Sequence, residues 1–334
     1  MTEEKVLINR LNMLRGLFAI LIVIGHTSMF YEDELIVLGT IHKLNMVSVG
    51  FFLYTSGISM AYNYDMKRDY LKGFFRRKCI FLFLVACLAQ LMDQVLQHII
   101  FDIDYTFNSK FFFSINWYVY EIIALYTVFY LLYKAVKNTI IRELLLLAIS
   151  TGLGMLTLYL LKHGSWSVWN KSFYFSILSF PLGVIVHNHY EKLERLVRKH
   201  RSISVVTLIA AVMASSASVL MNPETILGGI LLRNAFGAGL LLILSIALLY
   251  IAIEGNESFS KILKVTSDYS LEVYLYHFIA LSFIARIFDD RWTYDIRYTL
   301  AVLAATAILA LGMHKIDRII AKIINGVDKH YEKN

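Results

Sequence analysis

The segment MLRGLFAILIVIGH, residues 13–26, is apolar over most of its length yet carries Arg15 and His26. In a helix turning about 100° per residue, the eleven steps between them return to nearly the same face, about 16 Å further along the axis. Ionisable side chains in such a segment are expected to face a cavity or a partner, because lipid solvates them poorly. For Arg15 alone, a position beside lipid phosphates is the alternative. The small and polar neighbours of His26 favour a cavity there.

The composition extends this membrane interpretation to the whole chain. Of 334 residues, 58% are hydrophobic and 17% are charged, whereas soluble proteins carry about 25% charged residues. Apolar runs long enough to cross a bilayer recur throughout. We therefore predict an all-α polytopic membrane bundle, one domain over residues 1–334, with ten spans at 11–30, 44–64, 79–100, 116–133, 144–161, 172–187, 203–221, 226–251, 271–288 and 297–313.

Loop charges predict the orientation. Six basic residues lie in 65–78 and five in 187–202, and five follow Met313, whereas 31–43 has one and 221–225 has none. Cytoplasmic loops are the lysine- and arginine-rich ones, so both termini are predicted to be cytoplasmic. The net charge of +7 therefore reflects topology, and no nucleic-acid partner is expected.

The tail after the last predicted span, residues 314–334, repeats isoleucines on one helical face. We expect either an amphipathic helix lying on the cytoplasmic surface or a plain continuation of the last span. Only two cysteines occur in the chain, Cys79 and Cys87, both within one apolar run. We therefore expect no disulfide and no metal site.

Further polar and aromatic residues lie within the predicted spans or at their ends, and each has a functional and a structural interpretation. Ser56 is either a site residue or part of a small-residue helix contact, and the basic cluster either binds phosphate or anchors the topology. Trp117 is either a site residue or part of an aromatic belt, and the others are either site residues or packed polar groups. The set comprises Ser56, the cluster Arg76, Arg77 and Lys78, then Trp117, Glu121, Arg233 and His277.

Taken in order, these motifs resemble the acyltransferase-3 family of bacterial integral-membrane acyltransferases. The resemblance covers essentially the whole chain and rests on RLNMLRGLFAILIVIGH (10–26), VSVGFFLYTSGISM (47–60), INWYVYEIIALY (115–126), FPLGVIV (180–186) and SDYSLEVYLYHF (267–278). One segment departs from the family pattern. The family often has two arginines three residues apart, then a proline, where this chain has FFRRKCIF (74–81), which leaves open which cation has the arginine role.

The resemblance implies transfer of an acyl group, usually acetyl, from cytoplasmic acyl-CoA to a carbohydrate hydroxyl at the surface of a bacterial cell. With it we assign catalysis to His26, Arg15 and Glu121, and donor binding to Arg76, Arg77 and Lys78. Ser56, Trp117, Arg233 and His277 are assigned to substrate binding or to structure. His26 is the predicted general base, or alternatively a residue that itself accepts the acyl group.

A competing hypothesis is a transporter or flippase for lipid-linked saccharides, since polar residues inside spans suit that role equally. An acyltransferase consumes acyl-CoA and needs His26, and a flippase does neither. The expected partners are acyl-CoA, a carbohydrate acceptor and the lipid bilayer of the bacterial cytoplasmic membrane. Both a monomer and a homo-oligomer are compatible with the sequence.

Overall fold

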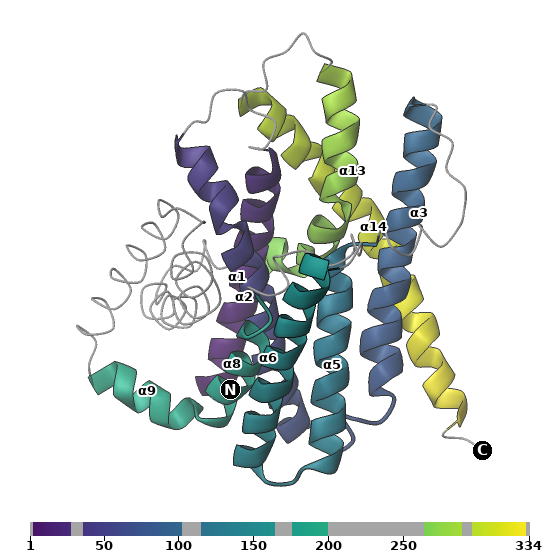
Figure 1. The fold of residues 1–334 in the computed structure, drawn as a ribbon. Coiled ribbons are helices and arrows are strands. Elements are labelled where there is room, and N and C mark those ends of the chain that lie inside the picture. Colours follow the sequence, from purple (N-terminus) through teal and green to yellow (C-terminus); the bar gives the residue numbers. More distant parts are fainter. Residues whose placement is uncertain are drawn as a thin grey trace.

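The computed structural model (Figure 1) describes residues 3–27, 36–101, 115–163, 176–199, 264–288 and 296–331, which fold into helices with no strand among them. The helices are α1 (Glu3–Thr27), α2 (Ile36–Met66), the π-helix η2 (Arg76–Ile80), α3 (Phe81–Phe101), α5 (Trp117–Ala135), α6 (Thr139–His163), α8 (Ser179–Asn188), α9 (Tyr190–Lys199), α13 (Ser270–Phe288) and α14 (Ile296–Tyr331). The all-α prediction is confirmed for this part of the chain.

Within the described residues, four helical segments are long and apolar enough to cross a membrane: Arg76–Ile99, Thr139–Thr157, Ser270–Ile287 and Ile296–Ile324. A shorter apolar segment covers Met13–Thr27. Large apolar side chains are exposed on the outer helices, as with Ile99 at 72% and Ile308 at 70%. Such a surface is costly in water and suits a lipid environment, so the chain is a membrane protein.

Eight of the ten predicted spans overlap helices of the structure, and the described part of 172–187 contains most of α8, Ser179–Asn188. The other two, 203–221 and 226–251, lie outside the described residues, and Arg233 lies there with them. The start of α1 and the end of α14 both lie toward the lower end of the molecule in Figure 1. The total of ten spans and the cytoplasmic placement of both termini stay predictions.

The last helix, α14, runs without a break from Ile296 to Tyr331. The helix thus includes the predicted tail up to Tyr331, and the placement of that tail on the cytoplasmic surface or within the last span stays a prediction. Ile316, Ile319 and Ile323 are exposed, whereas Ile320 packs against the main core.

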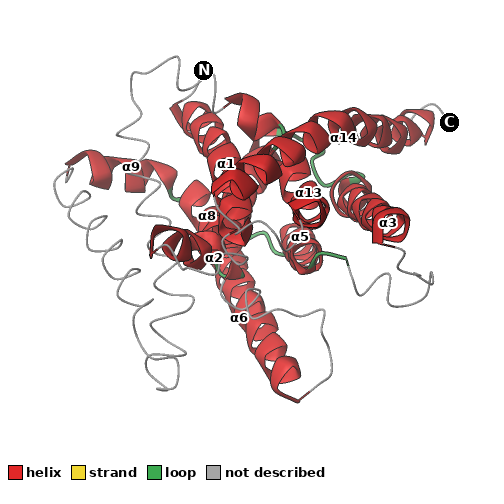
Figure 2. Ribbon diagram, turned by 90° about the horizontal axis from the view of Figure 1, so that it is seen from above, coloured by secondary structure: helices red, strands yellow, loops and turns green. Residues whose placement is uncertain are grey.

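Viewed from above, α1, α2, α5 and α13 occupy the middle of the bundle, while α6, α3 and α14 extend toward its edge (Figure 2). Helix α2 packs against both α1 and α8. Two glycines allow the close approach of α2 to α8: a Cβ on Gly57 would overlap the carbonyl oxygen of Phe180, and one on Gly183 would overlap that of Tyr54. The small-residue helix contact expected near Ser56 is therefore made by its neighbour Gly57.

At one end of the bundle, polar contacts join α2, α6 and α8. His187 Nε2 lies 2.9 Å from Asp65 Oδ2, and Asn188 Nδ2 donates to Glu143 Oε1 at 2.7 Å. His189 Nε2 lies 3.1 Å from the other oxygen of Glu143. These contacts provide partners for polar side chains that follow an apolar segment, and they hold α8 in place beside α2.

Candidate functional site

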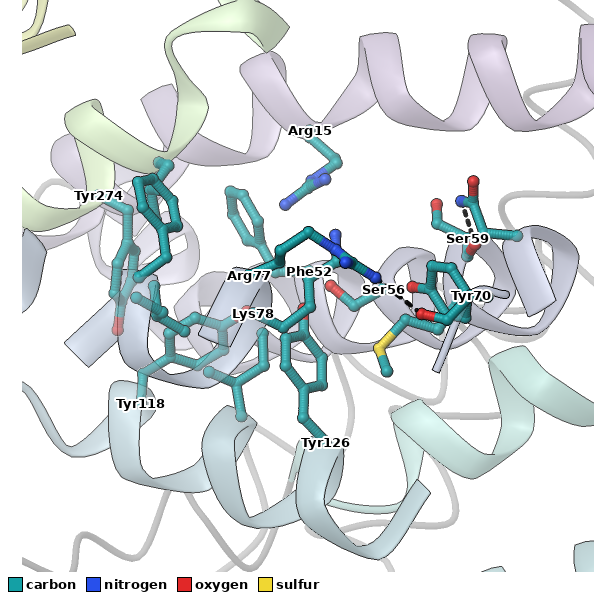
Figure 3. Close-up of a pocket in the computed structure, with 16 residues that line it drawn as sticks. Arg15, Phe52, Ser56, Ser59, Tyr70, Arg77, Lys78, Tyr118, Tyr126 and Tyr274 are labelled. Atoms are coloured by element: carbon teal, nitrogen blue, oxygen red, sulfur yellow. Dashed lines mark hydrogen bonds between the residues drawn. The ribbon is translucent and has the colours of Figure 1, made fainter. Parts of the chain in front are cut away.

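A cavity of about 260 Å³ lies in the middle of the bundle, with lining residues from α1, α2, η2, α3, α5 and α13 (Figure 3). Its wall combines cations, hydroxyls and aromatic rings. Among these residues are Arg15, Arg77 and Lys78, the hydroxyl residues Ser56, Ser59 and Tyr70, and the rings of Phe52, Tyr118, Tyr126 and Tyr274.

The cavity is electropositive. Arg15 reaches it from α1, while Arg77 and Lys78 reach it from η2 (Figure 3). The Arg15 guanidinium lies over the Phe52 ring, 5.4 Å from its centroid, and its buried Nε has no hydrogen-bond partner among the described residues. None of the described residues that line the cavity is an aspartate or a glutamate. Three cations without a lining carboxylate favour an anionic ligand.

The turn before η2 positions the two basic residues. Gly73 has a φ of 64°, a left-handed conformation that glycine adopts without steric cost, and its carbonyl accepts from Arg77 N at 3.1 Å. The Arg77 side chain donates from Nη2 to the Tyr70 carbonyl at 2.9 Å. The π turn over 76–80 places Arg77 and Lys78 in the cavity wall, and Arg76 is not among the lining residues.

Tyr70 adds a hydroxyl at the same place. Its side chain is buried, and its Oη has no hydrogen-bond partner among the described residues. Burial raises the pKa of Tyr70 well above its ordinary value of 10.0, with a smaller opposite effect from Arg77. The phenol therefore keeps its proton and can donate it in a hydrogen bond to an anion.

His26 and His277 form a pair between α1 and α13. The distance from His277 Nε2 to His26 Nδ1 is 3.2 Å, and the ring centroids are 5.0 Å apart. Phe278 packs against both rings, with centroid distances of 4.8 Å to His26 and 4.3 Å to His277. Two helices that are distant in the sequence thus contact each other through these imidazoles.

More polar groups contact the two residues of α1 that flank His26. The hydroxyls of Thr27 and Thr299 lie 2.9 Å apart. Asn45 from α2 occupies the space that a Cβ on Gly25 would fill, and its buried amide has no hydrogen-bond partner among the described residues. An unpartnered buried amide is costly, which makes Asn45 a candidate ligand-binding group beside Gly25, the residue before His26.

Tyr274 connects the cavity to the histidine pair. Its side chain lines the cavity, and its hydroxyl donates to Asn116 Oδ1 at 3.0 Å. Its own backbone carbonyl lies 2.7 Å from His277 Nδ1. Asn116 also caps α5 by accepting from the backbone N–H of Tyr118. One residue of α13 therefore takes part in both regions.

A family model for an acyltransferase domain matches residues 8–314, nearly the whole chain. The chain belongs to the acyltransferase-3 family. Membership makes it a membrane acyltransferase and confirms the resemblance drawn from its motifs. No match was found among curated proteins or among solved structures.

The acyltransferase-3 motifs contribute unequally to this site. The structure places Arg15, Ser56, Arg77 and Lys78 in the cavity wall, and it pairs His26 with His277. Trp117 begins α5 and packs against the core instead.

Glu121 is fully buried on α5 and does not line the cavity. Its Oε1 accepts from the Ser176 hydroxyl at 2.7 Å, and its Oε2 has no hydrogen-bond partner in the described chain. Its catalytic role stays a prediction.

Among the residues of this acyltransferase-3 site that were not singled out from the sequence are Asn45, Tyr70, Asn116 and Tyr274. Asn45 had a usable signal, since it is an amide within a predicted span. The tyrosines resemble the many aromatic residues that pack in the core, and Asn116 resembles an ordinary helix cap.

Proposed function

We propose that this protein transfers an acyl group, acetyl in the simplest case, from cytoplasmic acyl-CoA to a hydroxyl of a cell-surface carbohydrate or its precursor. The observation that carries the proposal is the cation-lined cavity, whose wall residue Tyr274 contacts the histidine pair through its carbonyl. Membership of the acyltransferase-3 family supports the reaction class.

The cavity would hold the phosphate-bearing end of the donor. Coenzyme A carries several phosphate oxygens, which match the guanidinium groups of Arg15 and Arg77 in charge and geometry. Lys78 adds a third cation, and Tyr70 adds a neutral donor. Because Arg15 Nε lacks a partner in the described chain, a bound phosphate would also satisfy a buried donor.

The spacing of Arg15 and His26 along α1 suits a donor whose reactive group lies far from its phosphates, at the end of a long chain. Arg15 and His26 are eleven helical steps apart on α1, or about 16 Å of helix axis. Coenzyme A has this form, with its thioester at the end of a long, flexible chain. The phosphates would bind at Arg15 while the thioester reaches toward His26.

His26 would act as the general base. It removes the proton from the acceptor hydroxyl as the oxygen forms a bond to the acyl carbon, and the carbon–sulfur bond breaks to release a thiolate. The imidazolium then returns the proton to sulfur, which leaves an ester and free coenzyme A. A histidine is suited to this exchange because its ordinary pKa lies near neutrality.

The acceptor would bind beside the histidine pair. Asn45 offers an amide donor and an acceptor for sugar hydroxyls. In the predicted orientation in the bacterial cytoplasmic membrane, His26 lies toward the outer end of its span and the basic cluster lies toward the cytoplasm, where acyl-CoA is found. Donor and acceptor would then approach from opposite sides.

The test compares surface polysaccharide by mass spectrometry from cells with wild-type protein, His26→Ala, His98→Ala or no protein. Consumption of labelled acetyl-CoA is measured in membranes from the same cells. We expect one acyl increment per modified sugar in the wild type and in His98→Ala, a matched histidine on α3. His26→Ala, at equal protein level, should lose both signals.

Two outcomes would contradict this proposal. Normal acylation by His26→Ala would remove His26 as the base. Unchanged glycan masses in every strain, with no consumption of acetyl-CoA and an altered export of saccharide, would favour the transporter hypothesis.

A further inference from the structure

The hydrogen bonds of His277 determine its tautomer. Its ring is fully buried, and Nδ1 lies 2.7 Å from the Tyr274 carbonyl oxygen. A carbonyl oxygen only accepts hydrogen bonds, so Nδ1 carries a proton. A buried imidazole with no carboxylate partner among the described residues is neutral, because an unpaired buried charge is too costly. Nε2 of His277 is therefore an acceptor.

The tautomer of His26 follows from that acceptor. Its Nδ1 lies 2.9 Å from the Ile22 carbonyl oxygen and 3.2 Å from His277 Nε2. Both of these atoms accept, so the N–H must be on His26 Nδ1, shared between them as a bifurcated bond. If the proton were on Nε2 instead, the lone pair of His26 Nδ1 would face lone pairs of both the Ile22 carbonyl oxygen and His277 Nε2. Neutral His26 thus has its basic lone pair on Nε2.

We propose that His277 is a positioning residue that fixes His26 in the Nδ1–H tautomer, so that Nε2 is the atom that accepts the proton from the acyl acceptor. The inference rests on the proposed function. In the resulting chain of hydrogen bonds, His26 Nδ1–H donates to His277 Nε2, and His277 Nδ1–H donates to the carbonyl oxygen of Tyr274 in the cavity wall.

This arrangement has a specific chemical consequence. When His26 takes the acceptor proton on Nε2, its ring becomes cationic and the Nδ1–H becomes a stronger donor. His277 Nε2 is already positioned to receive that bond, so no reorganisation is needed as the charge develops. In many hydrolases a carboxylate orients the catalytic histidine. Here the orienting group is a neutral imidazole.

The anchoring of the chain links it to the donor. Tyr274 lines the cavity and is held by the bond from its hydroxyl to Asn116. The carbonyl that orients His277 therefore belongs to a residue expected to contact the donor. Phe278 packs against both imidazoles, which limits their rotation.

Nitrogen-15 NMR of histidine-labelled protein in lipid bilayers tests the tautomer directly and needs no activity. His26→Ala identifies the His26 signals in the spectrum. We expect a protonated Nδ1 and an unprotonated Nε2 for His26 in the wild type. His277→Gln should preserve this state, because its amide oxygen replaces the ring acceptor, whereas His277→Leu should give a mixture of tautomers. A proton on Nε2 of His26 in the wild type would overturn the inference.

Kinetics of acetyl-CoA consumption test the consequence. His277→Leu should lower kcat on the order of 10²-fold, as a misplaced catalytic group does, with the donor KM unchanged. His277→Gln should recover most of that loss, and His98→Gln should match the wild type. Equal activity of the Leu and Gln variants would overturn the positioning role. If instead His26→Ala remains fully active, the proposed function fails, while the NMR result still decides the tautomer.

Discussion

The two functional regions of this bundle differ in how they handle charge. The cavity gathers Arg15, Arg77 and Lys78 from segments far apart in the chain. The histidine pair is held by the carbonyls of Ile22 and Tyr274 and by an aromatic ring. A guanidinium beside His26 would repel the imidazolium that a general base becomes. In the proposed mechanism, separating the cations from His26 along α1 would let one region bind an anion while the other accepts a proton.

The largest effect should come from a change that disrupts both regions together. Gly57→Leu would drive a side chain into the backbone of α8 at Phe180. Overpacking against backbone cannot relax easily, so we expect a loss of about 3 kcal/mol of stability, with acyl-CoA binding and turnover both lost. Thermal unfolding in detergent would measure this. Gly152→Leu is the matched control, since a Cβ at that position would meet no neighbouring atom within 4 Å among the described residues; equal stability of the two variants would contradict the close contact.

The next largest effect should come from a substitution that changes the cavity and leaves the histidine pair unchanged. Arg77→Ala removes a cation from the cavity but leaves the histidine pair intact, so the donor KM should rise roughly 10- to 100-fold, the value of a charged hydrogen bond or two. The kcat should change little. Arg76→Ala should raise the donor KM much less, because Arg76 does not line the cavity. Steady-state kinetics over a range of acetyl-CoA concentrations would check this. A larger rise of the donor KM in Arg76→Ala than in Arg77→Ala would assign donor binding to Arg76 instead of Arg77.

The smallest effect should come from the boundary between the regions. Asn116→Ala removes both the cap of α5 and the acceptor of the Tyr274 hydroxyl. A lost N-cap costs about 1 kcal/mol, and a less ordered Tyr274 should also lower kcat a few-fold. Asn138 caps α6 through Ile141 N, so Asn138→Ala should lose similar stability without lowering kcat. Thermal unfolding and turnover measured together would distinguish the two variants. An equal loss of kcat in Asn116→Ala and Asn138→Ala would show that the hydrogen bond from Tyr274 to Asn116 is not needed for turnover.

Much of this fold could be predicted, because apolar length and basic loops are local properties of a sequence. Arg15 and His26 both lie on α1, but of these two residues only Arg15 lines the cavity. The pairing of His26 with His277 could not be predicted, since 251 residues separate them and only packing brings α1 and α13 together. Each was visible only as a polar residue in an apolar segment.

The basic cluster shows a second kind of limit. Sequence alone could not decide which of Arg76, Arg77 and Lys78 enters the site, because the direction of each side chain depends on local helical geometry. The π turn over 76–80 changes that direction, and such turns have no clear sequence signature although they are frequent at functional sites. The glycine before it, Gly73, was the nearest available hint.

The spacing within α1 has an evolutionary consequence. Substitution of one apolar residue by another between Arg15 and His26 leaves the relative direction of the two side chains unchanged. Insertion or deletion of a single residue there would rotate one against the other by about 100° and separate His26 from His277. The number of residues between Arg15 and His26 is therefore fixed across descendants of this chain. Gly16 and Gly25 are fixed as well, because a Cβ there would overlap Thr266 and Asn45.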